Sequence, residues 1–349
     1  MVARPVLVAA AIASATALVI GAAPAQAAAP AYVALGDSYS SGTGTRSYID
    51  DGTSCQRSVY AYPSLISSAK GYALNFRACS GAKIPDVTNT QLSALSSSTA
   101  YVTISVGGND AGFASVLTTC AQPAWLSNCY GAVDKAQSYI RNTLPGSLKT
   151  LYASIRSRAP QAKVTVVGYP RIFNGEDCNL LTWFSPTEEK RLNETADLMN
   201  STLAARAGAS GFSFADPTSR FVGHAVCDSP EWLNGLSTPT SESYHPNKTG
   251  QSSGYTPAVS PFVTGATVTV TAALLTRAQG SSKKLADGQR RYAAADGAIQ
   301  PEVVRAPDLT TATARAAAER AGVDLSDRAS IDAADRIWSA RQAAEQSRR

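Results

Sequence analysis

Five short stretches of apolar, β-branched and aromatic residues recur along the first two thirds of the chain. They predict strands at residues 31–36, 72–78, 101–107, 162–170 and 211–216. Most of these stretches are continuous rather than alternating, which is typical of strands buried on both faces. Stretches with helical periodicity lie between them, at 61–70, 129–159 and 185–208. This alternation predicts a doubly wound α/β domain with three layers, α/β/α, around a parallel sheet of about five strands.

Two of the predicted helices carry local signals for where they begin or break. Ser185 is placed as an N-cap, Pro186 at the first helical position, and Glu188 where it completes a capping box. In the stretch 129–159, Pro145 and its neighbouring glycine predict a break into two helices.

The N-terminal 28 residues have a different pattern. Arg4 precedes a long apolar run, and small residues at 25–27 form a cleavage-like motif, which together predict a secretory signal peptide over residues 1–28. The alternative is a transmembrane anchor. Polar residues, a glycine and a proline interrupt the run, however, and a span needs ~20 predominantly apolar residues. We therefore expect a secreted, extracellular protein without a stable membrane anchor.

The composition changes again after about residue 278. A polar segment containing Pro301 and Pro307 is followed by stretches rich in Ala, Arg and Asp with helical charge spacing. We expect a main domain over 29–278 and a tail over 279–349, made of a linker and one or two exposed helices. Trp338 is among the few apolar residues available for docking. The tail is expected to be helical or partly disordered and to carry no chemistry.

Charge and cysteine content narrow the function classes. The net charge is +5, from 31 Lys and Arg against 26 Asp and Glu. These charges are spread along the chain, so no basic patch indicates a nucleic-acid partner. Six cysteines behind a signal peptide indicate three disulfides. Six cysteines allow 15 pairings; pairing of neighbours is the simplest arrangement, namely Cys55–Cys79, Cys120–Cys129 and Cys178–Cys227. No Cys-x-x-Cys motif and only two histidines are present, so we expect no metal site.

Chemically useful residues follow the ends of three predicted strands. Ser38 lies just past the first, Gly81 past the second, and Asn109 past the third. Ligands bind outside the carboxyl ends of the strands in such sheets, so these residues are expected to meet in one crevice. A serine becomes a nucleophile for acyl transfer when a base removes its proton. The backbone N–H groups of Ser38 and Gly81, with the Asn109 side chain, offer three donors for the oxyanion.

The base must be one of two histidines, His224 or His245. His224 lies three residues before Cys227, in a loop that a disulfide would hold, and we interpret it as a structural or pocket-wall residue. His245 lies in a polar loop after the last strand, precedes a proline that disfavours helical geometry, and has Glu242 three residues upstream. We therefore assign His245 as the base.

These motifs resemble the four signature blocks of the SGNH, or GDSL-type, hydrolases. The blocks "ALGDSYSSG", Gly81, "VGGND" and "SYHPN" occur in the family's order, and the six cysteines and the segment 223–235 resemble secreted actinobacterial lipases, esterases and phospholipases A1. The resemblance covers roughly residues 30–278. It implies a flavodoxin-like catalytic domain, Ser38 as the nucleophile, and His245 as the base. Gly81 and Asn109 would complete the oxyanion hole.

Two features of this chain depart from the family pattern. The family has Asp three residues before the histidine, where this chain has Glu242. Glutamate can orient an imidazolium if its longer arm reaches Nδ1. Some relatives instead use a backbone carbonyl of this loop, which Glu242 or Ser243 would offer, so a triad and a dyad both remain open. The tail beyond about residue 280 is the second departure, because it does not belong to the family's catalytic core.

The resemblance implies an ester hydrolase that needs no cofactor, acting as a monomer on an acyl-ester or lipid substrate. A lipase, a phospholipase A1 and a carbohydrate acetyl esterase all remain open. A silent binding protein on the same fold is the alternative outside enzymes. Apolar residues that would line an acyl groove follow the motifs, or they serve ordinary packing. They are Phe113, Val116, Leu117, Trp125 and Leu126.

Overall fold

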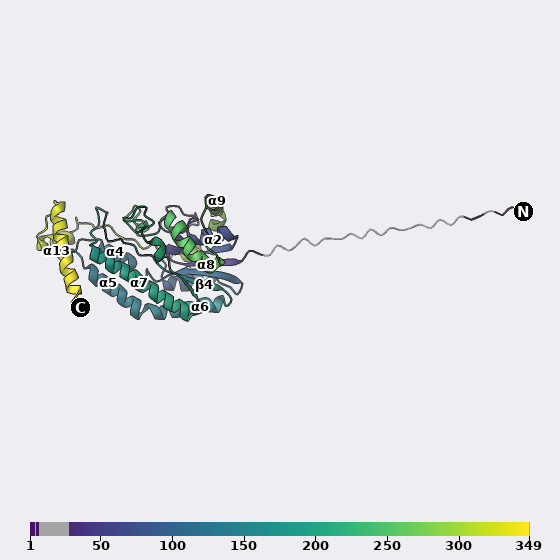
Figure 1. Ribbon diagram of the computed structural model, residues 1–349, viewed down its shortest axis with the longest axis horizontal. Helices are drawn as coiled ribbons and strands as arrows, with labels where there is room; N and C mark the ends of the chain where they lie inside the picture. Colours follow the sequence, from purple (N-terminus) through teal and green to yellow (C-terminus); the bar gives the residue numbers. More distant parts are fainter. Residues whose placement is uncertain (4, 7–27, 349) are drawn as a thin grey trace.

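The computed structural model describes residues 1–3, 5–6 and 28–348 (Figure 1). The predicted signal peptide lies mostly outside these residues and stays a prediction. Within the described part, five parallel strands form one sheet in the order β2-β1-β3-β4-β5. The strands are β1 (Ala31–Gly36), β2 (Ala73–Phe76), β3 (Thr99–Ser105), β4 (Lys163–Val167) and β5 (Ser213–Ala215). This is the flavodoxin-like strand order, and the predicted fold class is confirmed.

Helices cover both faces of the sheet. One layer contains α2 (Tyr62–Lys70) and α8 (Thr256–Thr264), which pack together. The other contains α5 (Cys129–Asn142), α6 (Leu144–Arg158) and α7 (Pro186–Ala209) (Figure 1). Continuous burial of β1 from Tyr32 to Gly36 follows from this double cover. The hydroxyl of Tyr32 still finds a partner, Thr103 Oγ1 at 2.9 Å, in the neighbouring strand. The apolar runs in the sequence are thus strands with two buried faces.

The predicted helix signals are present in the structure. α7 spans Pro186–Ala209, with Ser185 as its N-cap and Glu188 completing the capping box. The stretch 129–159 forms α5 (Cys129–Asn142) and α6 (Leu144–Arg158), which break at Thr143 with Pro145 in the first turn of α6. Proline suits that position because the N–H it lacks would have no partner in the first turn.

All six cysteines form disulfides between sequence neighbours: Cys55–Cys79, Cys120–Cys129 and Cys178–Cys227. These are the pairs of the simplest arrangement given above. Cys120–Cys129 joins the last residue of α4 (Phe113–Cys120) to the first residue of α5.

The C-terminal tail differs from the expectation of an exposed appendage. It contains α10 (Ser282–Arg290), α11 (Ala293–Asp296), α12 (Ala312–Ala321) and α13 (Arg328–Gln346), while α9 (Ala272–Gly280) spans the expected boundary at residue 278. α10 packs beside β2, and α13 packs beside α5 at the other end of the molecule (Figure 1). Between the two ends the chain crosses the carboxyl edge of the sheet. The tail packs against the domain because it buries both apolar and charged side chains there. Its polar composition gave no indication of this packing.

Tail packing also decides between the two roles left open for Trp125 and Leu126, an acyl groove and ordinary packing. Trp125 is buried with Ala317, Ala318 and Ile331 of the tail, and Leu126 packs against the same cluster. These two side chains therefore lie under the tail and do not line an acyl groove.

In the described part of the chain, none of the helices combines the length and apolar character that a membrane crossing requires.

Candidate active site

Ser38 lies where β1 turns sharply into α1 (Ser38–Ser41), at the carboxyl edge of the sheet. The turn depends on Gly36, which has φ of +118° and packs so tightly that a Cβ would lie 2.2 Å from the Ser105 carbonyl oxygen. Asp37 is the N-cap of α1. The Ser38 N–H opens the helix, where N–H groups have no intrahelical partner. Ser38 is thus both a side chain facing the crevice and a backbone donor.

His245 lies next to Ser38. Its Nε2 atom is 2.8 Å from Ser38 Oγ, and its Nδ1 atom is 2.9 Å from the Ser243 carbonyl oxygen. A carbonyl only accepts, so this contact fixes the tautomer with the proton on Nδ1. Nε2 is then left to accept the serine proton. The structure therefore brings together the nucleophile and the base that the sequence predicted.

The Glu242 side chain is engaged elsewhere. Its Oε1 accepts a hydrogen bond from Tyr48 Oη at 2.6 Å, and its Oε2 lies 3.3 Å from Arg46 Nε. The geometry thus favours the dyad over the triad, with the Ser243 carbonyl as the group that orients His245. The Glu242 carboxylate instead ties this loop to the loop after α1.

The predicted oxyanion donors surround the same point. Ser38, Gly81, Asn109 and His245 line one small pocket. One N–H of Asn109 Nδ2 donates to the Ala82 carbonyl at 3.0 Å, which holds the amide in place and leaves its second N–H for a ligand. Gly81 adopts φ of +85°, a conformation that favours glycine. The three expected donors therefore belong to one cavity.

Burial sets the charge state of the base. His245 is almost fully buried beside the rings of Tyr39 and Phe113, whose centroids lie 5.1 and 6.5 Å from its own. Desolvation lowers the pKa of His245 to about 4, although the bond to the Ser243 carbonyl opposes this shift. The imidazole is neutral at pH 7 and is ready to accept a proton.

Asp37 was missed as a site residue by the sequence analysis. It is buried, and its carboxylate accepts hydrogen bonds from Ser105 Oγ and Tyr169 Oη, both at 2.6 Å, and from the Tyr39 N–H at 3.1 Å. Burial raises the pKa of Asp37 to about 6 in spite of these bonds. Asp37 connects β1, β3 and the end of β4 directly below Ser38. Tyr169 follows β4, but the predicted strand ran to residue 170, so the strand-end rule that found Asn109 did not find Tyr169.

An apolar cavity extends from Ser38 between α4, α5 and α7. It offers about 80 Å³ to the centre of a water-sized sphere. Phe113, Val116 and Leu117 line it as expected, together with Ile140 and Met199 from the facing helices. The chemistry at Ser38 therefore adjoins a space suited to hydrocarbon.

His224 lies in a different environment. Its ring stacks on Trp232 with centroids 3.7 Å apart, and its Nδ1 lies 2.9 Å from the Pro230 carbonyl oxygen. These contacts agree with a structural role.

A group of Cys178, Cys227 and Glu231 has the spacing of a metal site among the described residues. Its two sulfurs are joined in a disulfide and are not free thiolates.

Residues 34–252 match the model of the GDSL-like lipase/acylhydrolase family. Lipase 1 of Streptomyces coelicolor is 46% identical over 251 residues, covering 70% of this chain and 92% of the relative. The solved structure of an extracellular lipase from Streptomyces rimosus is 43% identical with a TM-score of 0.62, covering 68% of this chain and 100% of that chain. A phospholipase A1 from Streptomyces albidoflavus gives 42% identity and a TM-score of 0.62, covering 66% of this chain and 98% of that chain.

Proposed function

The chain belongs to the GDSL-like lipase/acylhydrolase family and is a carboxylic ester hydrolase, and on that premise we propose that it cleaves acyl esters of lipids through a Ser38–His245 dyad. The observation that carries the proposal is the pair of contacts made by the imidazole. Nε2 lies 2.8 Å from Ser38 Oγ, and Nδ1 lies 2.9 Å from the Ser243 carbonyl oxygen. This is the geometry of an activated nucleophile with an oriented base.

The reaction proceeds in two steps. As Ser38 Oγ attacks the ester carbonyl carbon, its proton passes to His245 Nε2, and the carbonyl oxygen becomes an oxyanion. His245 then gives the proton to the departing alcohol oxygen, which leaves an acyl-enzyme at Ser38. A water molecule, deprotonated by the same nitrogen, then attacks the acyl carbon. The bond from that carbon to Ser38 Oγ breaks, His245 returns the proton to Ser38 Oγ, and the acid is released. The Ser243 carbonyl stabilises the imidazolium formed in each step.

The oxyanion is held by the N–H groups of Ser38 and Gly81 and by the Asn109 amide. Support comes from their common pocket and from the Ala82 carbonyl that fixes the amide. Loss of one such donor costs about 3 to 4 kcal/mol of transition-state stabilisation. Asp37 contributes by holding the first turn of α1, so it is a positioning residue.

The apolar cavity supports a hydrocarbon acyl chain as the group transferred to Ser38. Lipase activity in the Streptomyces relatives agrees with this. Phospholipase A1 activity is the second candidate, favoured by the similarity to a solved enzyme of that activity. The two differ in the alcohol part of the substrate, which the acyl cavity does not contact.

We place the enzyme outside the cell. The N-terminal pattern of a signal peptide, the three disulfides and the similarity to an extracellular lipase support this location.

The two histidines provide a matched test. His245→Gln and Ser38→Ala are expected to abolish hydrolysis of p-nitrophenyl butyrate and labelling by a fluorophosphonate, whereas His224→Gln keeps both. Phosphatidylcholine with positional analysis of the released fatty acid then separates the two candidate activities from each other. Full hydrolysis by Ser38→Ala would refute the proposed nucleophile.

A further inference from the structure

Residues 297–305, here called the strap, cross directly over the catalytic pocket. A Cβ on Gly81 would lie 1.9 Å from the Gln300 carbonyl oxygen and 3.1 Å from the Pro301 Cα, so the strap backbone rests on Gly81. Further along, Glu302 and Val304 line the pocket that holds Ser38 and His245. The strap thus forms part of the wall of the pocket that holds the nucleophile.

The closed pocket leaves little room for substrate. It offers about 10 Å³ to the centre of a water-sized sphere, and a cavity needs roughly 10–15 Å³ on this measure to hold one water. An ester that reaches Ser38 must also place its alcohol part beside His245. The apolar cavity on the acyl side does not include the strap among its walls. The strap therefore obstructs the oxyanion and leaving-group side.

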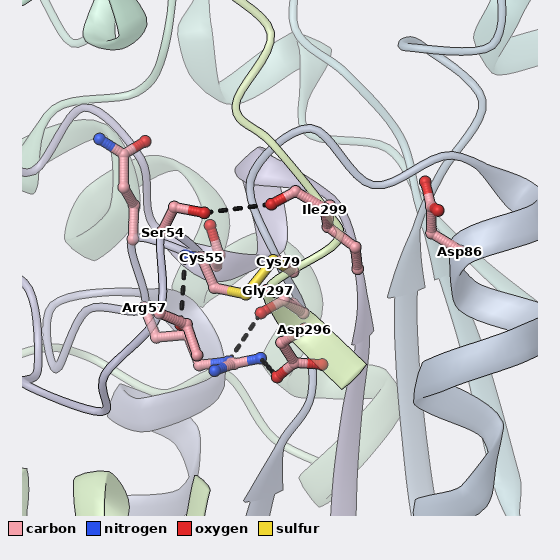
Figure 2. Close-up of a disulfide and its surroundings, with 12 residues drawn as sticks. Ser54, Cys55, Arg57, Cys79, Asp86, Asp296, Gly297 and Ile299 are labelled. Atoms are coloured by element: carbon pink, nitrogen blue, oxygen red, sulfur yellow. Dashed lines mark hydrogen bonds and ion pairs between the residues drawn. A yellow bond between two sulfur atoms is a disulfide. The ribbon is translucent and has the colours of Figure 1, made fainter. Parts of the chain in front are cut away.

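The N-terminal end of the strap is held in two ways, by the ion pairs of the preceding residue, Asp296, and by packing of Ile299 against a disulfide. Asp296 is buried between Arg57 and Arg77, with O···N distances of 2.6 Å to each, and Figure 2 shows it beside Arg57. Ile299 packs against the Cys55–Cys79 disulfide, and its carbonyl accepts a hydrogen bond from Ser54 Oγ at 3.1 Å (Figure 2). This end is fixed beside the pocket.

The other end is held by weaker contacts. Val304 is buried at the edge of the main core, and the Arg305 N–H donates to Thr118 Oγ1 at 3.0 Å. Lys83 and Glu302 form an ion pair at 2.8 Å, but both side chains are exposed, and exposed pairs contribute little. Beyond Arg305 the chain is largely exposed as far as α12. The strap can therefore lift at this end while Asp296 stays anchored.

The strap also lies outside the part of the chain that the family shares. The family match ends at residue 252. The two Streptomyces structures are matched over 98 and 100% of their length while covering about two thirds of this chain. The obstruction is therefore an addition to a domain whose relatives are enzymes.

We propose that the strap is an autoinhibitory segment that holds the catalytic pocket closed, and that substrate enters when residues 300–305 lift from Gly81 and Ser38. This rests on the proposed function, because it takes Ser38 and His245 as the reacting pair. The observed rate is then the rate of the open enzyme multiplied by the fraction that is open. Weakening the strap raises activity.

Two neighbouring valines test this in the full-length protein. Val304 is 2% exposed and Val303 is 41% exposed, so Val304→Asp lifts the strap and Val303→Asp does not. We expect Val304→Asp to raise kcat/KM for p-nitrophenyl acetate and the rate of fluorophosphonate labelling by about tenfold or more. Val303→Asp should match the parent protein.

A second pair of variants, with smaller changes, keeps the test decisive if Val304→Asp does not fold. Thr118→Val removes the hydrogen bond to the strap, whereas Thr119→Val removes only a bond within α4, to the Ser115 carbonyl. Thr118→Val should raise the labelling rate by about threefold, the effect of one hydrogen bond. Thr119→Val should leave the rate unchanged.

The outcomes separate the two proposals. If parent and variants hydrolyse esters at equal rates, or folded Val304→Asp and Thr118→Val are slower than the parent, the strap is not inhibitory and the proposed function stands. If Ser38 is unlabelled and inactive in every variant, the proposed function fails as well. A rise confined to Val304→Asp and Thr118→Val supports the strap.

Discussion

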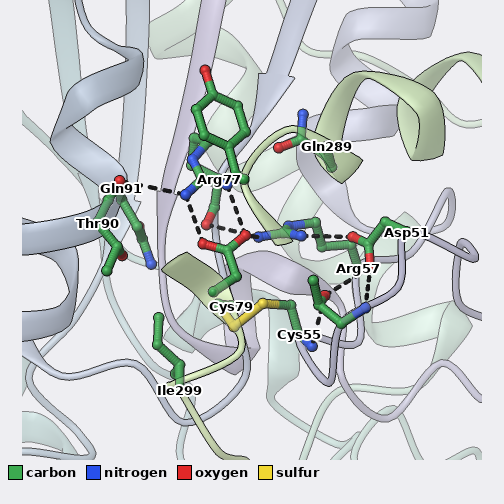
Figure 3. Close-up of polar contacts among 12 residues, drawn as sticks. Asp51, Cys55, Arg57, Arg77, Cys79, Thr90, Gln91, Gln289 and Ile299 are labelled. Carbon is green, nitrogen blue, oxygen red and sulfur yellow. Dashed lines mark hydrogen bonds and ion pairs between the residues drawn. A yellow bond between two sulfur atoms is a disulfide. The ribbon is translucent and has the colours of Figure 1, made fainter. Parts of the chain in front are cut away.

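Asp296 is the side chain whose removal should test most directly how the tail is held. It is fully buried, and Arg57 and Arg77 are also buried. Oδ2 contacts Arg57 Nη2 at 2.6 Å and Arg77 Nη1 at 2.8 Å, while Oδ1 contacts Arg77 Nη2 at 2.6 Å. Arg57 has a second carboxylate partner in Asp51, at 2.6 Å (Figure 3). Asp296→Ala therefore leaves Arg77 as the guanidinium without a carboxylate partner.

The magnitude follows from that uncompensated charge. Removing one member of a buried ion pair costs about 3 to 5 kcal/mol, because the remaining charge stays desolvated. We expect the lower part of this range, because Arg57 keeps Asp51. Arg77 also keeps two neutral contacts: its guanidinium carbon lies 3.7 Å from the centroid of the Tyr292 ring, and its Nη2 donates to the Thr90 carbonyl at 3.4 Å. A loss of about 3 kcal/mol is a large share of the ~5 to 15 kcal/mol by which domains are stable.

Urea denaturation followed by tryptophan fluorescence measures this loss, as a lower midpoint with an unchanged slope. Asp287→Ala is the matched control in the same tail, since Asp287 pairs with Lys283 and Arg290 at the surface. Its midpoint should equal that of the parent protein. If Asp296→Ala lost less than about 1 kcal/mol, the buried network would not hold the tail, and the inference of a fixed N-terminal anchor would fail.

Four further predictions concern the catalytic site and the apolar cavity beside it. Glu242→Gln should keep kcat/KM for p-nitrophenyl butyrate within about threefold of the parent, since the Ser243 carbonyl orients the base; a loss of about 10⁴, as in a triad that loses its acid, would restore Glu242 to that role. Because only neutral His245 accepts the proton and burial lowers its pKa to about 4, kcat/KM should rise through about pH 4; a midpoint at 6.5 or above would contradict this. The same shift means that the stability His245 confers is complete above pH 6.5 and is lost as pH falls towards 4, which thermal unfolding across that range checks. Ala136→Leu, inside the apolar cavity, should lower the preference for p-nitrophenyl palmitate over acetate by about tenfold, whereas Ala132→Leu, on the outer groove of α5, should not change it.

Much of the fold could be predicted because its signals are local. The strands of this sheet are apolar runs, since helices cover both faces, and α7 begins with a capping box that acts within four residues. The first strand was predicted with its observed bounds, whereas other predicted strands extend beyond the observed ones, as at β4, which ends at Val167 instead of residue 170. The apolar run continues through the turn that places Tyr169 beside Asp37.

The nucleophile and the base of the candidate site could be predicted because the sequence offers few candidates for each role. Two histidines and one strand-end serine left few combinations, and the structure brings Ser38 and His245 together. The role of Asp37 could not be predicted, because its partners Ser105 and Tyr169 are contributed by other strands. The choice between Glu242 and a carbonyl also depends on how the loop folds, which spacing does not encode.

The tail was the least predictable part. Its residues are mainly polar and small, so they give no strong period of apolar positions. What binds it are pairings over long sequence separations, such as Asp296 with Arg57 and the Asp335 carboxylate with the Ala124 N–H at 2.7 Å. A charged residue destined for burial looks the same in the sequence as one destined for the surface.

The carbonyl that orients His245 has a consequence for how this enzyme tolerates mutation. Every amino acid supplies the same carbonyl at position 243, so no substitution there deletes the orienting group. The orientation of His245 is instead sensitive to residues that hold the backbone of this loop in place, and Asn234 makes several of the hydrogen bonds that do so. Its main chain pairs with Tyr244 and His245, and its side chain binds the carbonyls of Gly44 and Glu242. The sequence constraint that a triad would place on its acidic residue falls here on Asn234, which lies eleven residues before His245 and takes no part in the chemistry.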